Sequence, residues 1–120
     1  MSFKLLATAV TSLAVLPIGA AVLGGGAAQA APTCGTVTYP RTGTVGVIEV
    51  RSGSVSCAEA RKVIDRYLHD KTLVGQGNTD SKRFDGWLCA SPTAVAAQEY
   101  GYSTGCSREL PAARVVVVPR

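Results

Sequence analysis

The clearest pattern of hydrophobic and polar positions along the chain lies between Val55 and Asp70. Apolar side chains recur there at i, i+3, i+4, i+7 and i+8, at Ala60, Val63, Ile64, Tyr67 and Leu68. This spacing places them on one face of a helix. Ser56 and Glu59 have the spacing of a capping box, in which the hydroxyl and the carboxylate each accept from a backbone N–H at the helix start. We therefore expect a main amphipathic helix here.

Shorter apolar runs predict strands on both sides of this helix. Residues Val45–Arg51 are rich in β-branched side chains, and Trp87–Ala90 is a short apolar run. Residues Arg114–Val118 contain four consecutive valines, a composition that suits a strand covered on both faces. The strands therefore precede and follow the main helix in the sequence.

A second, short helix is predicted between Ser91 and Gly101. Ser91 suits its N-cap, Pro92 suits the first helical position, and Gly101 ends it. The expected fold class is α+β, with one main amphipathic helix and a short second helix packed on a small sheet of three or four strands, stabilised by disulfides. Trp87 is the only tryptophan, and we expect it to pack against the main helix.

Residues 1–30 have the pattern of a secretory signal peptide. Lys4 precedes an apolar run, and Pro17 and a run of glycines then interrupt it. The segment Ala28–Ala30 provides the small residues that a signal peptidase accepts. The alternative is a membrane anchor, which needs about 20 apolar residues. Because Pro17 and the glycines break the run, we expect cleavage and no stable membrane insertion afterwards.

Cleavage before Ala31 would leave enough chain for one domain. Residues 31–44 are rich in Pro, Gly and Thr and predict an extended N-terminal arm, and residues 45–120 predict a single α+β domain. Without Lys4 the formal net charge falls from +4 to +3. Such a weak charge fits an anionic cell wall or an ordinary solvated surface. No basic cluster predicts a nucleic-acid partner.

The four cysteines predict two disulfides, because an even number in a short exported chain is typical of a disulfide framework. A zinc site is the alternative, but the chain has no C-x-x-C pair, so we expect neither a metal nor a cofactor. If the first strand runs up and the helix descends, the Trp87 strand returns Cys89 to the level of Cys57. This geometry favours the pair Cys57–Cys89 and leaves Cys34–Cys106 to fasten the arm.

Two groups of residues could carry catalysis, and we expect neither to do so. Residues Gly101–Gly105 match the G-x-S-x-G pattern of a hydrolase nucleophile elbow, with Ser103 as nucleophile. The elbow requires a strand before the serine, whereas here a helix is predicted. His69, the only histidine, could be a general base with Glu59 or Asp65. In the last helical turn it instead suits the helix dipole, so we expect no catalytic residues.

Several short motifs together resemble a known group of proteins. The run GSVSCAEARKVIDRYL is followed by GNT, by DGWLCASPTA and by a cysteine after a glycine-rich turn. In order and spacing these motifs resemble small secreted actinobacterial proteins of unassigned function, built as a signal peptide and one cysteine-bridged domain. The matching positions are Val55, Ser56, Cys57, Ala58, Ala60, Gly77, Asn78, Thr79, Gly86, Trp87, Cys89, Pro92, Thr93 and Cys106. The resemblance implies export and the bridged fold, and it brings no catalytic residues.

The sequence predicts a small secreted or cell-wall-associated domain that acts by binding, not by catalysis. Its partner is unknown and could belong to the cell wall or be an extracellular protein. A secreted protease inhibitor is the alternative, with the long polar segment from Lys71 to Gly86 as its exposed loop. A small extracellular hydrolase or nuclease that uses His69 is the third hypothesis. The most informative observation would be whether this segment and the polar face of the main helix line a concave pocket.

Overall fold

Six strands and two helices succeed one another along residues 32–120, the part of the chain that the computed structural model describes. In chain order they are β1 (Thr33–Thr38), β2 (Val45–Ser52), α2 (Cys57–His69), β3 (Lys82–Phe84), β4 (Trp87–Ala90), α3 (Ala94–Tyr100), β5 (Thr104–Glu109) and β6 (Ala112–Pro119). The predicted signal peptide, residues 1–30, lies outside the described residues.

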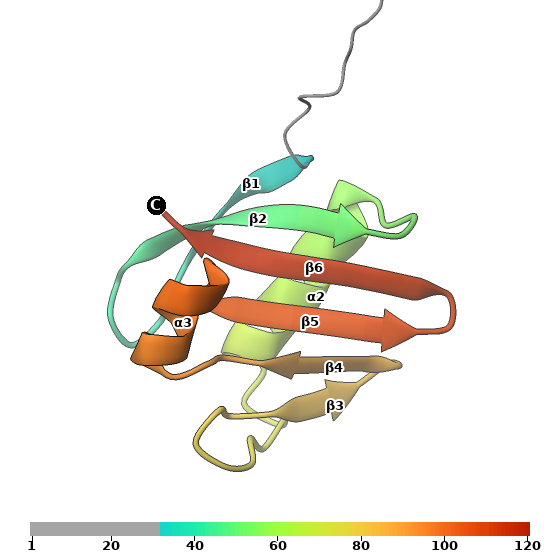
Figure 1. Cartoon of the computed structure of the whole chain (residues 1–120). Coiled ribbons are helices and arrows are strands. Elements are labelled where there is room, and N and C mark those ends of the chain that lie inside the picture. Colours follow the sequence, from blue (N-terminus) through green and yellow to red (C-terminus); the bar gives the residue numbers. More distant parts are fainter. Residues whose placement is uncertain (1–31) are drawn as a thin grey trace, which may run out of the picture. The chain divides into compact units, whose positions relative to one another are not determined.

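The strands form one antiparallel sheet in the order β1-β2-β6-β5-β4-β3 (Figure 1). The α+β class is confirmed, and the expected three or four strands are too few because the sheet has six. Strand β1 lies within the segment predicted as an extended arm, and β3 lies within the long polar segment. Strand β5 buries only Thr104 and Cys106, so its sequence lacks an apolar alternation.

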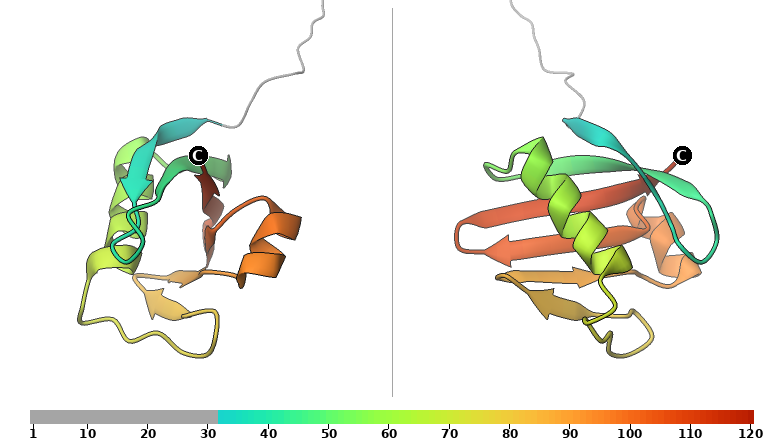
Figure 2. Two further views of the ribbon diagram at one scale, coloured as in Figure 1. Left: turned by 90° about the vertical axis from the view of Figure 1, so that its left-hand side faces the viewer. Right: turned by 180° about the vertical axis from the view of Figure 1, so that it is seen from behind.

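The two helices lie on opposite faces of the sheet (Figure 2). Helix α2 crosses the face that carries the core, and α3 lies against the other face near one end. The predicted apolar stripe is confirmed, because Ala60, Val63, Ile64 and Tyr67 are buried and Leu68 is half-buried. Trp87 is buried in the same core cluster, as expected.

Strand β6 is covered on both faces in its middle, as its valines predict. Val115 and Val117 belong to the core beneath α2, while Val116 points to the other face and is equally inaccessible. The strand pairs with β2 on one side and β5 on the other, so its backbone is also enclosed. It is the centre of the sheet.

Half of the predicted capping box is present at the start of α2. The Ser56 hydroxyl accepts from the Glu59 N–H at 3.1 Å, as expected. The Glu59 carboxylate does not complete the box. It accepts instead from the Arg108 guanidinium at 2.8 Å, and Arg108 in turn lies over the Trp87 ring. The carboxylate therefore ties the helix to strand β5.

Helix α3 begins later than its sequence predicts. Its N-cap is Thr93, whose hydroxyl accepts from the Ala96 N–H, and not Ser91. Ser91 cannot cap the helix because its N–H donates to the Thr79 carbonyl and its hydroxyl bonds to Tyr67 and Thr104. Gly101 ends the helix in the left-handed conformation, as predicted.

The two predicted disulfides are present, but both predicted pairings are wrong. The bonds join Cys34 to Cys57 and Cys89 to Cys106, not Cys57 to Cys89 and Cys34 to Cys106. Cys89 and Cys106 lie directly opposite each other on the neighbouring strands β4 and β5, a pair that the sequence geometry missed because β5 was not predicted. Cys34 lies on β1, which packs against α2 and so meets the first residue of that helix.

Candidate functional site

An open pocket of about 390 Å³ lies beside the C-terminal half of α2. Segments far apart in the sequence line it. The loop from Tyr39 to Thr42 after β1 forms one side, and Asn78, Asp80 and Lys82 of the segment before and within β3 form another. The remaining wall comes from α2, from the residues just after β4 and from Ser103 just before β5. The volume is within the range of small-molecule sites, about 300–1,000 Å³.

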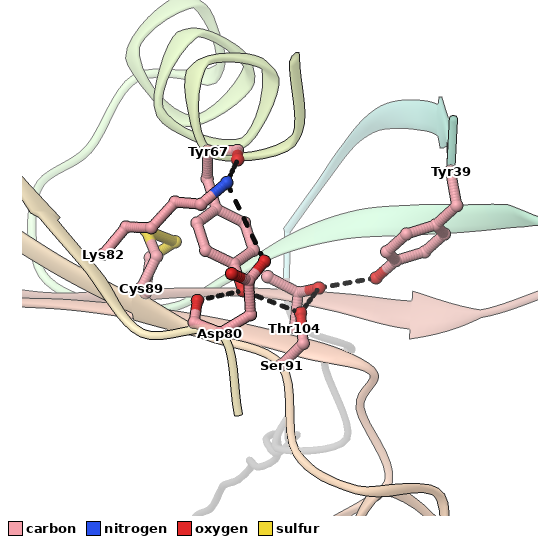
Figure 3. The surroundings of a disulfide bond; sticks show 8 residues. Tyr39, Tyr67, Asp80, Lys82, Cys89, Ser91 and Thr104 are labelled. Carbon is pink, nitrogen blue, oxygen red and sulfur yellow. Dashed lines mark hydrogen bonds and ion pairs between the residues drawn. A yellow bond between two sulfur atoms is a disulfide. The ribbon is translucent and has the colours of Figure 1, made fainter. Parts of the chain in front are cut away.

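Five side-chain hydroxyls lie in or directly behind the inner wall of this pocket and form an unbroken series of contacts. We call them the hydroxyl chain, and in order they are Ser103, Tyr39, Thr104, Ser91 and Tyr67. Figure 3 shows those of Tyr39, Thr104, Ser91 and Tyr67. The oxygen-to-oxygen distances along the chain are 2.6, 2.7, 3.1 and 3.0 Å. Thr104 is fully buried, and the other four line the pocket.

Both ends of the hydroxyl chain meet backbone carbonyls. At one end the Tyr67 hydroxyl donates to the Asp80 carbonyl at 2.9 Å. At the other end the Ser103 hydroxyl lies 3.2 Å from the Val117 carbonyl, which also accepts the Ser103 N–H at 2.8 Å. The hydroxyl chain therefore connects the segment before β3 to the central strand β6.

The Cys89–Cys106 disulfide fixes the centre of the hydroxyl chain. Cys89 and Cys106 are register partners on β4 and β5, and Ser91 and Thr104 lie two residues beyond them in the antiparallel sense. Two residues along a strand return to the same face, so the two hydroxyls meet beside the disulfide at 3.1 Å (Figure 3). The same bond that stabilises the domain thus aligns the site.

Tyr67 is the buried end of the hydroxyl chain, with an exposed fraction of 1%. Burial raises the pKa of its phenol to about 12, because the ionised form would lose its hydration. Lys82 lies over the Tyr67 ring, with Nζ at 4.9 Å from the ring centre and donating to the Tyr67 carbonyl at 2.9 Å. The Asp80 carboxylate is 3.8 Å from the same Nζ. The two charges therefore offset each other at this wall.

The segment that carries Asn78 and Asp80 is held in place by its own hydrogen bonds. Gln76 and Ser81 pair through two backbone hydrogen bonds of 3.0 Å, and the Thr79 carbonyl accepts from the Ser91 N–H at 2.8 Å. Gly75 leaves room for this fold, since a Cβ there would lie 1.5 Å from Oδ1 of Asp80. The pocket wall is thus fixed to the sheet.

The mouth of the pocket carries strong hydrogen-bond donors. Arg41 and Asn78 line it and are exposed. Within residues 32–120, neither side chain forms an ion pair or a hydrogen bond. Arg41 projects from the tight turn that Tyr39 and Thr44 close, where the Tyr39 N–H donates to the Thr44 carbonyl at 2.8 Å. A guanidinium offers five donors and an amide two, so these groups can bind acceptor atoms of a ligand.

The structure separates the residues that the sequence singled out for catalysis. His69 lies 3.1 Å from Asp65 on an exposed part of α2, and neither residue lines the pocket. Glu59 pairs with Arg108, away from both. Ser103 follows helix α3 and precedes β5, the reverse of the order that a nucleophile elbow requires, as predicted. It reaches the pocket as part of the hydroxyl chain instead.

One signal for this site is present in the sequence. Cys89-Ala90-Ser91 and Thr104-Gly105-Cys106 mirror each other, with a hydroxyl residue two positions from each cysteine. Given the Cys89–Cys106 bond, antiparallel pairing places those hydroxyls opposite each other. Tyr39 and Asp80 have no comparable signal, because they reach the pocket from loops. The long polar segment does line the pocket, but α2 contributes Tyr67 and Leu68 of its apolar stripe and not its polar face.

Two further properties concern the described residues alone. None of the helices within residues 32–120 is long and apolar enough to cross a membrane. In the same range, no group of three or more His, Cys, Asp and Glu side chains is arranged to hold a metal ion.

Comparison of the chain with models of protein families, with curated proteins and with solved structures found no match.

Proposed function

We propose that this protein is a small secreted or cell-wall-associated domain that acts by binding, and that the pocket beside α2 is its binding site. The observation that carries the proposal is the hydroxyl chain. Polar groups that converge on a preformed pocket, alongside the aromatic ring of Tyr39, are typical of small-molecule sites. The hydroxyl chain and the residues that it contacts are fixed to three strands and a helix, so the binding site is preorganised.

The contacts of the serines support binding over catalysis. A nucleophilic serine is activated by an adjacent base that is itself held by a third group. Ser91 bonds to Tyr67 and Thr104, and Ser103 bonds to Tyr39 and the Val117 carbonyl. These partners hold the hydroxyls in place and do not remove their protons.

Export is the second part of the proposal. Two disulfides in a small domain are typical of oxidising compartments outside the cytosol. The N-terminal signal-peptide pattern and the resemblance to small secreted actinobacterial proteins support the same location. Alkylation of the protein from culture fluid without a reductant should label none of the four cysteines. Labelling of all four, or retention in the cytosol, would contradict export.

Retention on cell-envelope preparations tests the binding role. Wild-type protein is expected to co-sediment with an envelope fraction, and Arg41→Ala and Asn78→Ala should reduce the retained amount by about three- to tenfold, because each removes hydrogen bonds worth about 0.5–1.5 kcal/mol. Arg83→Ala is the matched control, since Arg83 is exposed on β3 and does not line the pocket. Equal retention of all four proteins, or none, would count against the proposal.

A protease inhibitor remains the second candidate, and one observation favours it. Val74 is 81% exposed in a segment whose ends are fixed, by Thr72 bonding to Asp70 and by the pairing of Gln76 with Ser81. A rigid exposed loop is what a tight inhibitor requires. Incubation with secreted serine proteases decides between the two: lasting inhibition supports this candidate, and prompt cleavage next to Val74 without inhibition ends it.

A further inference from the structure

We infer that the ligand of this pocket is a neutral, hydroxyl-rich molecule, a carbohydrate, and not an anion or an amine. The inference rests on the proposed function and deepens it by naming the ligand class. It follows from the number of protons available to the hydroxyl chain and from the charges around it.

The hydroxyl chain has one proton fewer than its contacts require. Five hydroxyls supply five protons, while four contacts between hydroxyls and two contacts to carbonyls make six links. A carbonyl can only accept a hydrogen bond. If the contacts at both ends of the hydroxyl chain are hydrogen bonds, Tyr67 and Ser103 must therefore each donate their proton to a carbonyl. Two neighbouring hydroxyls within the chain would then face each other with lone pairs and no proton.

The distances indicate which of the six contacts has no proton. The Ser103 hydroxyl is 3.2 Å from the Val117 carbonyl, the longest of the six links, and that carbonyl already accepts the Ser103 N–H at 2.8 Å. Releasing this link lets Ser103 donate to Tyr39 at 2.6 Å. Every other proton then points the same way, from Tyr39 through Thr104 and Ser91 to Tyr67, and finally to the Asp80 carbonyl.

This orientation determines what the inner wall offers to a ligand. All five protons are used within the chain, so its members in the pocket present only lone pairs. Ser103 receives no proton from the chain, and its oxygen is the most available acceptor. At the mouth, Arg41 and Asn78 present donors instead. The pocket therefore has an acceptor wall and a donor rim.

Of anions, ammonium ions and polyhydroxyl molecules, only the last satisfy both surfaces. A carboxylate has no proton to donate and would meet lone pairs at the inner wall, and the negative charge of a phosphate would face the same lone pairs. An ammonium ion could donate to that wall but would meet the positive charge of Arg41, which, unlike that of Lys82, is not offset by a carboxylate among the described residues. A hydroxyl group both donates and accepts, and several hydroxyls on one ring can satisfy the wall and the rim together. The half-buried ring of Tyr39, which lines the pocket, provides apolar contact for the C–H groups of a sugar.

Titration of the isotope-labelled full-length secreted protein, followed by NMR, tests the inference. The probes are glucose, N-acetylglucosamine, sodium acetate, inorganic phosphate and ethylammonium chloride, each added separately. At least one sugar should shift the amide signals of Asn78, Ser91 and Ser103 in a saturable way. Asn78→Ala should weaken that binding by about three- to tenfold, and Arg83→Ala should leave it unchanged. Acetate, phosphate and ethylammonium should bind at least about tenfold more weakly.

Substitutions that interrupt the hydroxyl chain provide an internal check. Thr104→Val removes the group that accepts the Tyr39 proton, so this proton is free to point into the pocket. The variant should bind acetate more tightly than the wild type does and bind the sugar more weakly. Because Thr104 is buried and its loss could prevent folding, Tyr39→Phe serves as the second variant. It removes the hydroxyl that accepts the Ser103 proton, and this proton can return to the Val117 carbonyl at 3.2 Å instead of pointing into the pocket, so sugar affinity should fall and acetate affinity should stay unchanged.

The outcomes separate this inference from the proposed function. Tighter binding of acetate, phosphate or ethylammonium than of either sugar overturns the ligand class. No binding of any probe also overturns it, and if the protein is still retained on envelopes in an Arg41-dependent way, the proposed function survives alone. Sugar binding supports the inference. Release of the protein from envelopes by the same sugar identifies an envelope glycan as the source, and sugar binding without envelope retention identifies a free sugar.

Discussion

At the scale of single residues, Tyr67 joins the fold to the candidate site. Its ring belongs to the core beneath α2, and its hydroxyl ends the hydroxyl chain. The sequence predicted the ring correctly, because helical periodicity identifies a buried stripe. It could not predict the hydroxyl contacts, since Asp80 and Ser91 approach from a loop and a strand end whose positions depend on the whole sheet.

Alkaline titration tests the burial of Tyr67. Its folded-state pKa of about 12 exceeds the ordinary tyrosine value of 10.0, so the folded protein holds the phenolic proton more tightly than the unfolded chain does. Its contribution to stability is fully present below about pH 10 and is lost as the pH rises toward 12, by at most about 3 kcal/mol. Denaturant unfolding of wild type and Tyr67→Phe at several pH values measures this. Parallel stability curves for the two proteins would contradict it.

Asp70 makes the stability of the fold depend on pH in the acid range, and in the opposite direction, because its contribution is lost as the pH falls. Hydrogen bonds from the Thr72 hydroxyl and N–H, and from Arg66, lower the pKa of its carboxyl group to about 2, from 3.8. The stabilisation is present above about pH 4 and is lost as the pH falls toward 2. We expect the melting temperature of Asp70→Asn to depend less on pH in this range than that of the wild type, with Thr72→Val intermediate. An identical dependence for all three proteins would refute this assignment.

At the scale of elements, the segment between α2 and β3 forms one wall of the pocket through Asn78 and Asp80. The pairing of Gln76 with Ser81 in this segment and the three residues of β3 that follow it are too short to appear as a periodic pattern. In the structure, Gly75 permits a close approach by Asp80. The main helix and the strands β2, β4 and β6 were predictable because each buries an apolar pattern of its own.

Gly75→Ala should loosen this segment. The new Cβ would overlap the Asp80 carboxylate, but this exposed side-chain end can rotate away, so we expect a loss of at most about 1 kcal/mol, the lower end of overpacking costs. The clash, and not the backbone, is the cause, because Gly75 does not have a positive φ. Measured by chemical unfolding, the loss should shrink when the same change is made in an Asp80→Gly background. Additive losses in the double variant would show that the carboxylate is not responsible.

At the scale of the whole molecule, the two disulfides have different roles. Cys34–Cys57 ties the edge strand β1 to the start of α2, whereas Cys89–Cys106 joins β4 to β5 beside the hydroxyl chain. The sequence predicted two bonds but not their partners, because the pairing depends on strand neighbours that only the complete sheet determines. With β5 known, opposite positions on adjacent strands would have identified one bond directly.

Replacing each cysteine pair by alanine separates stability from site geometry. Both bonds close loops of similar length, with sequence separations of 23 and 17 residues. Each loss should therefore cost about 3 kcal/mol in the chain-entropy model. Only Cys89→Ala with Cys106→Ala should also shift the amide signals of Ser91 and Thr104 in the folded state. Equal shifts of these signals in both double variants would contradict a separate role in the site.

The central claim is that binding occurs in the pocket lined by the hydroxyl chain. Mapping of amide shifts in the wild-type protein, on addition of solubilised envelope glycans, tests this claim most directly. We predict that the largest changes lie at Asn78, Ser91 and Ser103, around the pocket wall. Saturable changes confined to β3 and β4 at the paired residues Arg83 and Leu88, with none around the pocket, would contradict it.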